Sequence, residues 1–164
     1  MKKITRYLAA ALSACLLLWS LTACGEAVAA RDRLGTLLSL IGEVPAGGIY
    51  ATLPQEGDTP LGEPLIEALY MRADGYLEYT DRIAEAAVYL GSSQEPFFEA
   101  AVFVCYGSAD TRAVLEMCMR RARLVASVHT VKEGDVVVAA SGRTVVYVIT
   151  RDTAAAQKAI DRLF

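Results

Sequence analysis

The pattern that most restricts the fold is a succession of two strand-like segments and a helix, which occurs twice in the second half of the chain. The first strand pair contains the apolar run Val102, Phe103 and Val104, and the second is β-branched on both sides of a Ser141-Gly142 turn signal. The expected segments are 82–90, 98–106, 108–126, 135–140, 143–150 and 154–163. Two hairpins, each followed by a helix, predict an α+β fold: an antiparallel sheet of about four strands with helices packed on one face.

Segment 82–90 leaves two interpretations open. The spacing of Ile83, Ala86 and Leu90 suits a helix, whereas the final Ala-Ala-Val-Tyr-Leu suits a strand. We predict a strand, because a clear strand follows directly and the two can form a hairpin.

The chain before this region is less regular. Apolar residues recur at helical spacing from Leu34 to Ile41, and Gly42 is expected to end that helix. Glycine and proline are so frequent between residues 45 and 62 that irregular backbone is expected there. A short helix is predicted to begin at Pro64 and to reach about residue 72.

The first residues have the three parts of a secretory signal: a basic start, an apolar run and small residues at the exit. The ending Leu21-Thr22-Ala23-Cys24 resembles the lipobox of bacterial lipoproteins, in which the cysteine receives a diacylglyceryl group and the signal peptidase then cuts in front of it. We therefore expect a signal helix over residues 1–23 that is cleaved between Ala23 and Cys24. A lipidated tether at 24–30 and a single domain at 31–164 would remain, and residues 60–164 carry the family resemblance described below.

An uncleaved membrane anchor is the alternative, since residues 7–23 reach the lower end of the ~17–25 residues that span a bilayer. A plain anchor, however, has no need of the Leu-x-Ala-Cys ending. A diacylglyceryl cysteine supplies the two acyl chains that stable anchoring takes. The expected location is extracytoplasmic, on the outer face of the bacterial cell membrane.

The charge of the mature chain limits its partners. Removing residues 1–23 takes away three of the 16 basic residues and leaves 13 against 19 acidic ones, a net charge of −6. Such a chain is repelled by nucleic acid and by an anionic membrane surface, so contact with the membrane is expected through the lipid on Cys24 alone. An envelope protein is the other possible partner.

The second half of the chain resembles a family of bacterial lipoproteins, the domain-of-unknown-function family numbered 4358. The resemblance covers roughly residues 60–164. It is carried by 85–89, 98–103, Ser108-Ala109-Asp110, Arg121, 136–138, Gly142 and 145–149. It implies a lipid-anchored α+β domain, and it implies no activity.

No set of catalytic or cofactor-binding residues is visible. The mature chain has one histidine, His129, and it lacks a nucleophile elbow, a phosphate-binding loop and cysteines at metal-binding spacing. We expect no metal and no cofactor. Cys105 and Cys118 remain after the signal and the anchor are set aside, and they could form a disulfide or lie buried as free thiols.

Three charged residues lie in segments that are expected to form the core. Glu85 and Glu99 could share one sheet face and do acid–base work, or both could mark the solvated face of a half-buried sheet. Arg121 falls inside the apolar stripe of the long helix, so it either snorkels to solvent, pairs with a carboxylate or lines a site. We expect it to be partly buried and paired.

These observations favour a membrane-tethered binding or interaction module without enzymatic activity. The alternative is a small envelope hydrolase that uses the sheet carboxylates. A solute receptor of a transport system is a third possibility, but two-lobed receptors are usually much larger than one domain of this size.

Overall fold

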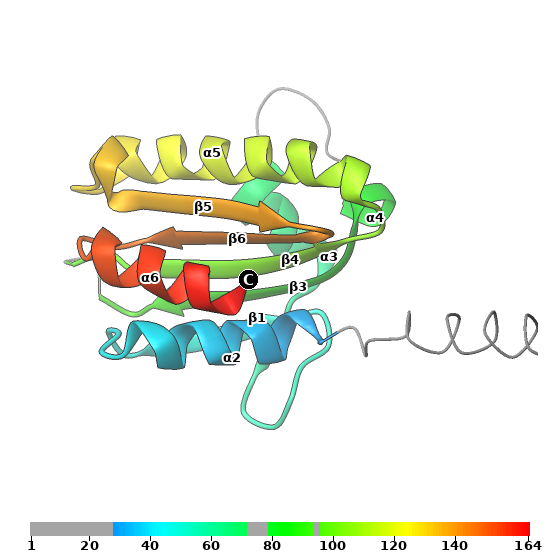
Figure 1. Cartoon of the computed structure of the whole chain (residues 1–164), viewed down its shortest axis with the longest axis horizontal. Helices are drawn as coiled ribbons and strands as arrows, with labels where there is room; N and C mark the ends of the chain where they lie inside the picture. Colours follow the sequence, from blue (N-terminus) through cyan, green and yellow to red (C-terminus); the bar gives the residue numbers. More distant parts are fainter. Residues whose placement is uncertain (1–27, 72–78, 94–95) are drawn as a thin grey trace, which may run out of the picture.

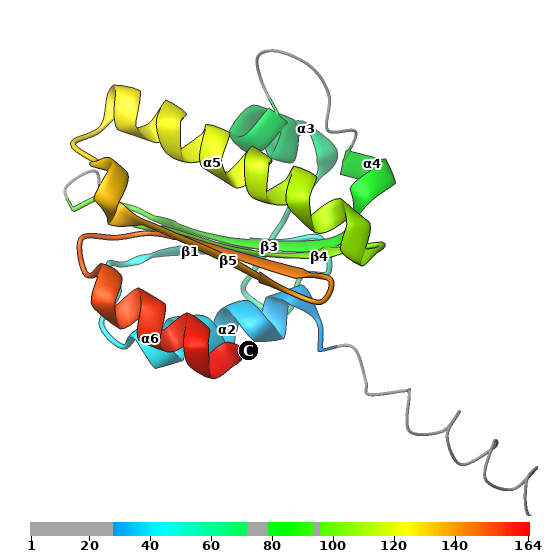
Figure 2. The ribbon, with the colours of Figure 1, turned by 45° about the horizontal axis from the view of Figure 1, so that its top comes forward.

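A computed structural model describes residues 28–71, 79–93 and 96–164. The expected signal peptide, its cleavage site at Ala23 and Cys24, and the tether as far as residue 27 lie outside these residues. The fold is α+β, with one six-stranded sheet between two layers of helices (Figures 1 and 2). None of the helices in the described ranges has the length and hydropathy needed to cross a membrane.

The sheet has the strand order β2-β1-β3-β4-β6-β5. All neighbouring strands are antiparallel except β1 and β2, which are parallel. The strands are β1 (Gly47–Ala51), β2 (Thr59–Pro60), β3 (Ile83–Gly91), β4 (Glu99–Cys105), β5 (Val136–Ser141) and β6 (Thr144–Ile149). The predicted strand at 82–90 is confirmed, because β3 covers Ile83–Gly91. A short helix, α4 (Tyr79–Arg82), comes directly before it.

The prediction of helices on one face only is wrong. α2 (Ala30–Ile41) and α6 (Thr153–Leu163) cover one face, and α5 (Thr111–Val128) covers the other together with α3 (Glu63–Ile66) and the π-helical turn η1 (Glu67–Met71), as Figure 2 shows. The reason lies in β4 and β6, whose residues are all buried. A strand with apolar side chains on both faces requires a cover on each side.

The core therefore has two halves, separated by the sheet. On the α5 side, Phe103, Tyr147 and Ile149 pack against Val114 and Met117. The other half consists of small and β-branched strand residues packed against α2 and α6. Burying apolar surface on both faces of one sheet is what holds these layers together.

The predicted sheet of about four antiparallel strands is also wrong, because β1 and β2 add two strands within the segment expected to be irregular. β1 begins with Gly47-Gly48, which looks like loop sequence. A Cβ on Gly47 would lie 2.3 Å from the backbone oxygen of Leu90 in β3, so the close approach of β1 to β3 requires a glycine.

Candidate functional site

A buried ion pair connects β4 with α5. Glu99 is fully buried, and the side chain of Arg121 is 14% exposed. Arg121 Nη2 donates to Glu99 Oε2 at 2.7 Å, and Arg121 Nε donates to both carboxylate oxygens at 3.2 Å. The planar guanidinium matches the carboxylate as a fork. Of the three roles considered for Arg121, the structure shows pairing, and Glu99 is the partner.

Two tyrosines complete this group, which we call the Glu99 cluster (Glu99, Arg121, Tyr70 and Tyr147). The Tyr70 hydroxyl, from η1, donates to Glu99 Oε1 at 3.0 Å, and the guanidinium carbon of Arg121 lies 6.0 Å from the Tyr70 ring centroid. The Tyr147 ring, from β6, lies 6.5 Å from that of Tyr70. The Tyr147 hydroxyl is buried and has no hydrogen-bond partner among the described residues.

Burial keeps the neighbours of the ion pair in their neutral forms. Burial and the charge of Glu99 raise the pKa values of Tyr70 and Tyr147 well above the ordinary tyrosine value. Burial also raises the pKa of Cys118, and it raises that of Cys105 to about 11. Burial alone would lower the pKa of Arg121, but the hydrogen bonds and charge of Glu99 outweigh it, and the pKa is raised. None of these groups is activated as a nucleophile at neutral pH.

The two thiols do not form a disulfide. Cys105 in β4 and Cys118 in α5 are both buried and free. They belong to the core on the α5 side of the sheet, where free cysteine behaves as a small apolar residue.

Glu85 and Glu99 do not form a pair, so the predicted shared face is wrong. In the β3–β4 register Glu85 lies opposite Val104, five residues from Glu99 along β4. An odd separation along a strand places two side chains on opposite faces. Glu85 instead accepts a hydrogen bond from the Ala30 backbone N–H at 2.9 Å, at the start of α2. The alternative of a common solvated face is also wrong, because Glu99 is fully buried.

His129 caps the C-terminus of α5, and its ring lies beside that of Phe97, with centroids 4.5 Å apart and ring planes tilted by 34°. Within the described ranges, no three His, Cys, Asp or Glu side chains gather closely enough to hold a metal ion. The position of His129 therefore suits packing at the end of the helix.

An apolar cleft lies between α5 and β5, and we call it the α5–β5 cleft. Its volume is about 470 Å³, and it is lined by Met119, Ala122, Arg123, Ala126, Lys132 and Val136. The four residues from α5 are spaced i, i+3, i+4 and i+7, so they form one flank of the helix. Ala122 is buried, Met119 and Val136 are half-buried, and Ala126 is exposed.

The rim of this cleft is positively charged. Arg123 and Lys132 are exposed, and neither forms an ion pair with another described residue. Helix α5 carries four arginines and one glutamate, although the whole chain has a net charge of −3. Positive charge is thus concentrated on the helix that forms the cleft.

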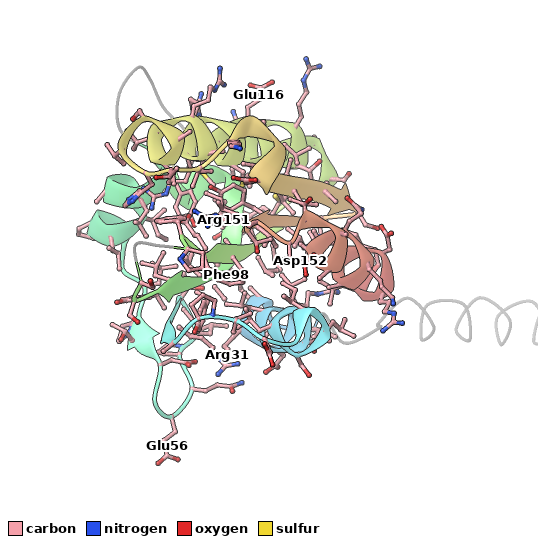
Figure 3. All side chains as sticks on the ribbon, turned by 90° about the vertical axis from the view of Figure 1, so that its left-hand side faces the viewer. Arg31, Glu56, Phe98, Glu116, Arg151 and Asp152 are labelled. Atoms are coloured by element: carbon pink, nitrogen blue, oxygen red, sulfur yellow. The ribbon has the colours of Figure 1, made fainter. Side chains whose placement is uncertain are left out.

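A second cleft of about 440 Å³ lies where three connections meet at one end of the sheet. Phe98, Arg151 and Asp152 contribute to it and are labelled in Figure 3. Its polar groups already serve local structure: Asp152 accepts from the Ala155 N–H and caps α6, and the Thr150 hydroxyl accepts from the Asp152 N–H. The α5–β5 cleft is the better candidate, because its two cations form no ion pair with other described residues, and Arg123 Nε makes only a hydrogen bond to the Met119 carbonyl of its own helix at 3.3 Å.

Comparisons with family models, with curated proteins and with solved structures gave no match to this chain. The likeness to the lipoprotein family therefore stays a prediction. Ala23 and Cys24, the predicted cleavage and anchor residues, lie outside the described residues.

Sequence reasoning did not identify the α5–β5 cleft. A signal for it was present, since Met119, Ala122 and Ala126 form a second apolar stripe beside the stripe of α5 that contains Val114 and Val125. Recognising the cleft also required the place of β5 at the edge of the sheet, which depends on strand order.

Proposed function

We propose that the chain is a lipid-anchored binding module of the bacterial cell envelope and that it holds its partner at the α5–β5 cleft. The lipobox-like ending at Cys24 supports the anchor and the extracytoplasmic location. The likeness to a lipoprotein family supports the same location. One observation carries the binding role: the cleft is apolar, lies beside an edge strand and has two cationic side chains at its rim. Concave apolar surfaces with a few polar groups are typical of binding sites.

The alternative of a hydrolase that uses sheet carboxylates has less support. Acid–base chemistry of that kind needs two carboxylates within reach of one substrate. Glu85 and Glu99 lie on opposite faces of the sheet. Glu85 already accepts a hydrogen bond from the Ala30 N–H, and Glu99 already forms an ion pair with Arg121. We therefore propose binding as the activity.

Photo-crosslinking in living cells tests the binding role. A photoreactive amino acid replaces Ala126 in the full-length, lipidated protein, and in a second strain it replaces Ala154. Both alanines are exposed on helices, but α5 and α6 cover opposite faces of the sheet. We expect a discrete crosslinked species from position 126 and none from position 154.

A cleft variant makes the result specific. Met119→Glu places a charge in the apolar cleft and should abolish the crosslink from position 126, while thermal melting shows whether the variant is folded. Equal crosslinking from both positions, or a crosslink that persists in a folded Met119→Glu protein, would contradict the proposal.

A further inference from the structure

The two edges of the sheet are protected very differently. β2 has two residues, one of which is Pro60, and proline offers no N–H to a further strand. β5 has six residues, Val136–Ser141, with three valines and neither a proline nor a charged side chain. Natural edge strands are usually short, charged or covered, because an open edge pairs with other strands. The strand β5 has none of the sequence features that discourage such pairing.

The hydrogen-bond register identifies the open groups of β5. The Thr150 N–H donates to the Asp135 carbonyl at 2.9 Å, and β5 continues in register with β6 from Val136 opposite Ile149 to Ser141 opposite Thr144. Bonded and non-bonded pairs alternate along an antiparallel ladder. Residues 137, 139 and 141 therefore bond to β6, and the N–H and C=O groups of Val136, Val138 and Ala140 point away from it. No described residue bonds to these outward groups.

The cleft is placed to receive side chains from a strand that pairs with this edge. Val136 lines the cleft, and Val136 and Val138 pack on the α5 side of the sheet, whereas Val137 and Ala139 pack on the other side. Side chains of an added strand would alternate in the same way. Every second side chain would lie on the α5 side, beside Met119 and Ala126.

Charge decides which kind of strand fits. Arg123 and Lys132 stand at the rim without ion-pair partners among the described residues. An acidic strand would supply those partners. A second copy of this chain, paired β5 to β5 about a two-fold axis, would instead place two α5 helices on the same face. Because Arg120 and Arg123 of each α5 are exposed and form no ion pair with other described residues, the two helices would repel each other.

We propose that the β5 edge accepts an extended segment of a partner protein as a seventh strand, and that this segment carries apolar side chains for the α5–β5 cleft and carboxylates for Arg123 and Lys132. The inference rests on the proposed function and adds the mode of recognition, which is β-strand addition. Backbone hydrogen bonds supply affinity in this mode, and the alternating side chains supply specificity.

The test uses the mature lipoprotein in detergent micelles and a capped peptide that is long enough to span β5. One face of the peptide strand, meant for the α5 side, carries valine at its centre and glutamate towards its ends, and the other face carries threonine. Hydrogen–deuterium exchange is measured at single amides. Without peptide, we expect fast exchange at Val136, Val138 and Ala140 and slow exchange at Val137 and Ala139. With saturating peptide, exchange of the first three amides should slow by about tenfold or more, because a bonded amide exchanges only when its bond opens.

Modified peptides and matched variants sharpen the test. N-methylation of every second peptide residue should abolish binding when the methylated N–H groups are those that point towards β5. Methylation of the alternate residues, whose N–H groups point away from β5, should leave binding unchanged. Arg123→Gln and Lys132→Gln should each weaken binding about 2- to 5-fold, as expected for exposed ion pairs, whereas Arg120→Gln, on an exposed arginine outside the cleft, should not. A peptide with lysine in place of these glutamates should not bind.

Several outcomes would overturn the inference. One is the absence of binding by the acidic peptide, and another is equal binding by the basic one. A peptide that perturbs Met119 and Ala122 but does not slow exchange of the β5 amides would refute strand addition as the mode of recognition. The proposed binding function would still stand in that case. Protection of α5 by anionic vesicles alone would indicate a membrane surface instead. The crosslink from position 126 tests the proposed function independently.

Discussion

Glu99 is the one charged residue that is fully buried in the part of the chain described by the structure, and both Arg121 and the Tyr70 hydroxyl meet its charge. A buried ion pair adds little net stability compared with apolar packing, because both charges lose their hydration. Removing one partner, however, leaves the other buried without compensation. Single substitutions in the Glu99 cluster therefore have effects that differ sharply from residue to residue.

Arg121→Ala should lower the free energy of unfolding by about 3–5 kcal/mol, because it leaves the Glu99 carboxylate buried and unpaired. The neighbouring Arg120 is exposed, and Arg120→Ala should change stability by less than about 0.5 kcal/mol. Urea denaturation followed by circular dichroism measures both, since Trp19, the only tryptophan, lies in the predicted signal. An Arg121→Ala protein that unfolds at the wild-type midpoint, together with an Arg121→Leu protein that loses a partner, would assign Arg121 to a binding site.

The two tyrosines should respond in opposite directions when their hydroxyls are removed. Tyr147→Phe deletes a buried hydroxyl without a described partner and should leave stability unchanged or raise it by up to about 1 kcal/mol. Tyr70→Phe deletes the donor to Glu99 Oε1 and should lower stability by about 1–3 kcal/mol. The same denaturation experiment compares them. Loss of stability in Tyr147→Phe would indicate a bound polar molecule at that hydroxyl.

Strand β1 depends on a close approach of its backbone to that of β3. Gly47→Ala should lower stability by about 1–3 kcal/mol, because the new Cβ would meet the Leu90 backbone oxygen at 2.3 Å and backbone cannot give way cheaply. Gly48→Ala is the matched control, since the nearest atom to its Cβ would be a Tyr50 ring carbon at 3.8 Å. Thermal unfolding compares the two variants, and equal melting temperatures would show that β1 can shift away from β3.

Helix α2 is fastened to the segment before β2 by an ion pair between Arg31 and Asp58, with Nε–Oδ2 and Nη2–Oδ1 distances of 2.7 and 3.1 Å. The hydrogen bond from Arg31 lowers the pKa of Asp58 below its ordinary value of 3.8. A lowered carboxyl pKa means that the stabilisation is complete above pH 3.8 and is lost as the pH falls through the folded-state pKa.

Asp58→Asn should therefore lower stability by about 1–2 kcal/mol at neutral pH, and the difference from wild type should shrink towards about pH 3. Urea midpoints across this range measure it. Glu56 extends from the tip of the same loop into solvent (Figure 3), and Glu56→Gln should have no effect larger than about 0.5 kcal/mol. If the loss of stability caused by Asp58→Asn were the same at every pH, the ionised Asp58 carboxylate would not be the source of the stabilisation.

The sequence was most informative where one element imposes a clear period. The hairpins β3–β4 and β5–β6 and the helices α5 and α6 follow from apolar runs and from the turn at Ser141-Gly142. The cap Asp152 also marks the start of α6. β1 was missed because Gly47-Gly48 has the composition of a loop, and its strand conformation comes from pairing with β3. The Glu99–Arg121 pair joins a strand to a helix 22 residues away, so local periodicity could place Arg121 on the buried side but could not select Glu99 over Glu85.

The predicted lipid anchor can be tested at Cys24. Cys24→Ala should abolish both lipid attachment and cleavage, because the thiol is the expected acceptor of the diacylglyceryl group. Metabolic labelling with a fatty acid, followed by immunoprecipitation, measures lipid attachment, and the shift in mass measures cleavage. Cys15→Ala, within the expected signal, is the control and should be processed normally. Incorporation of label into Cys24→Ala would refute the lipobox assignment.

The location of the two remaining thiols has a practical consequence for following this protein in the cell. Cys105 and Cys118 are fully buried and protonated while the domain is folded, and Cys24 would be blocked by its lipid. On a chain anchored as proposed, a maleimide that does not cross the cell membrane would then react only with molecules whose layers have separated. The labelled fraction would therefore measure how often the folded domain opens on the anchored chain, and so report its unfolding equilibrium through the chain's own thiols.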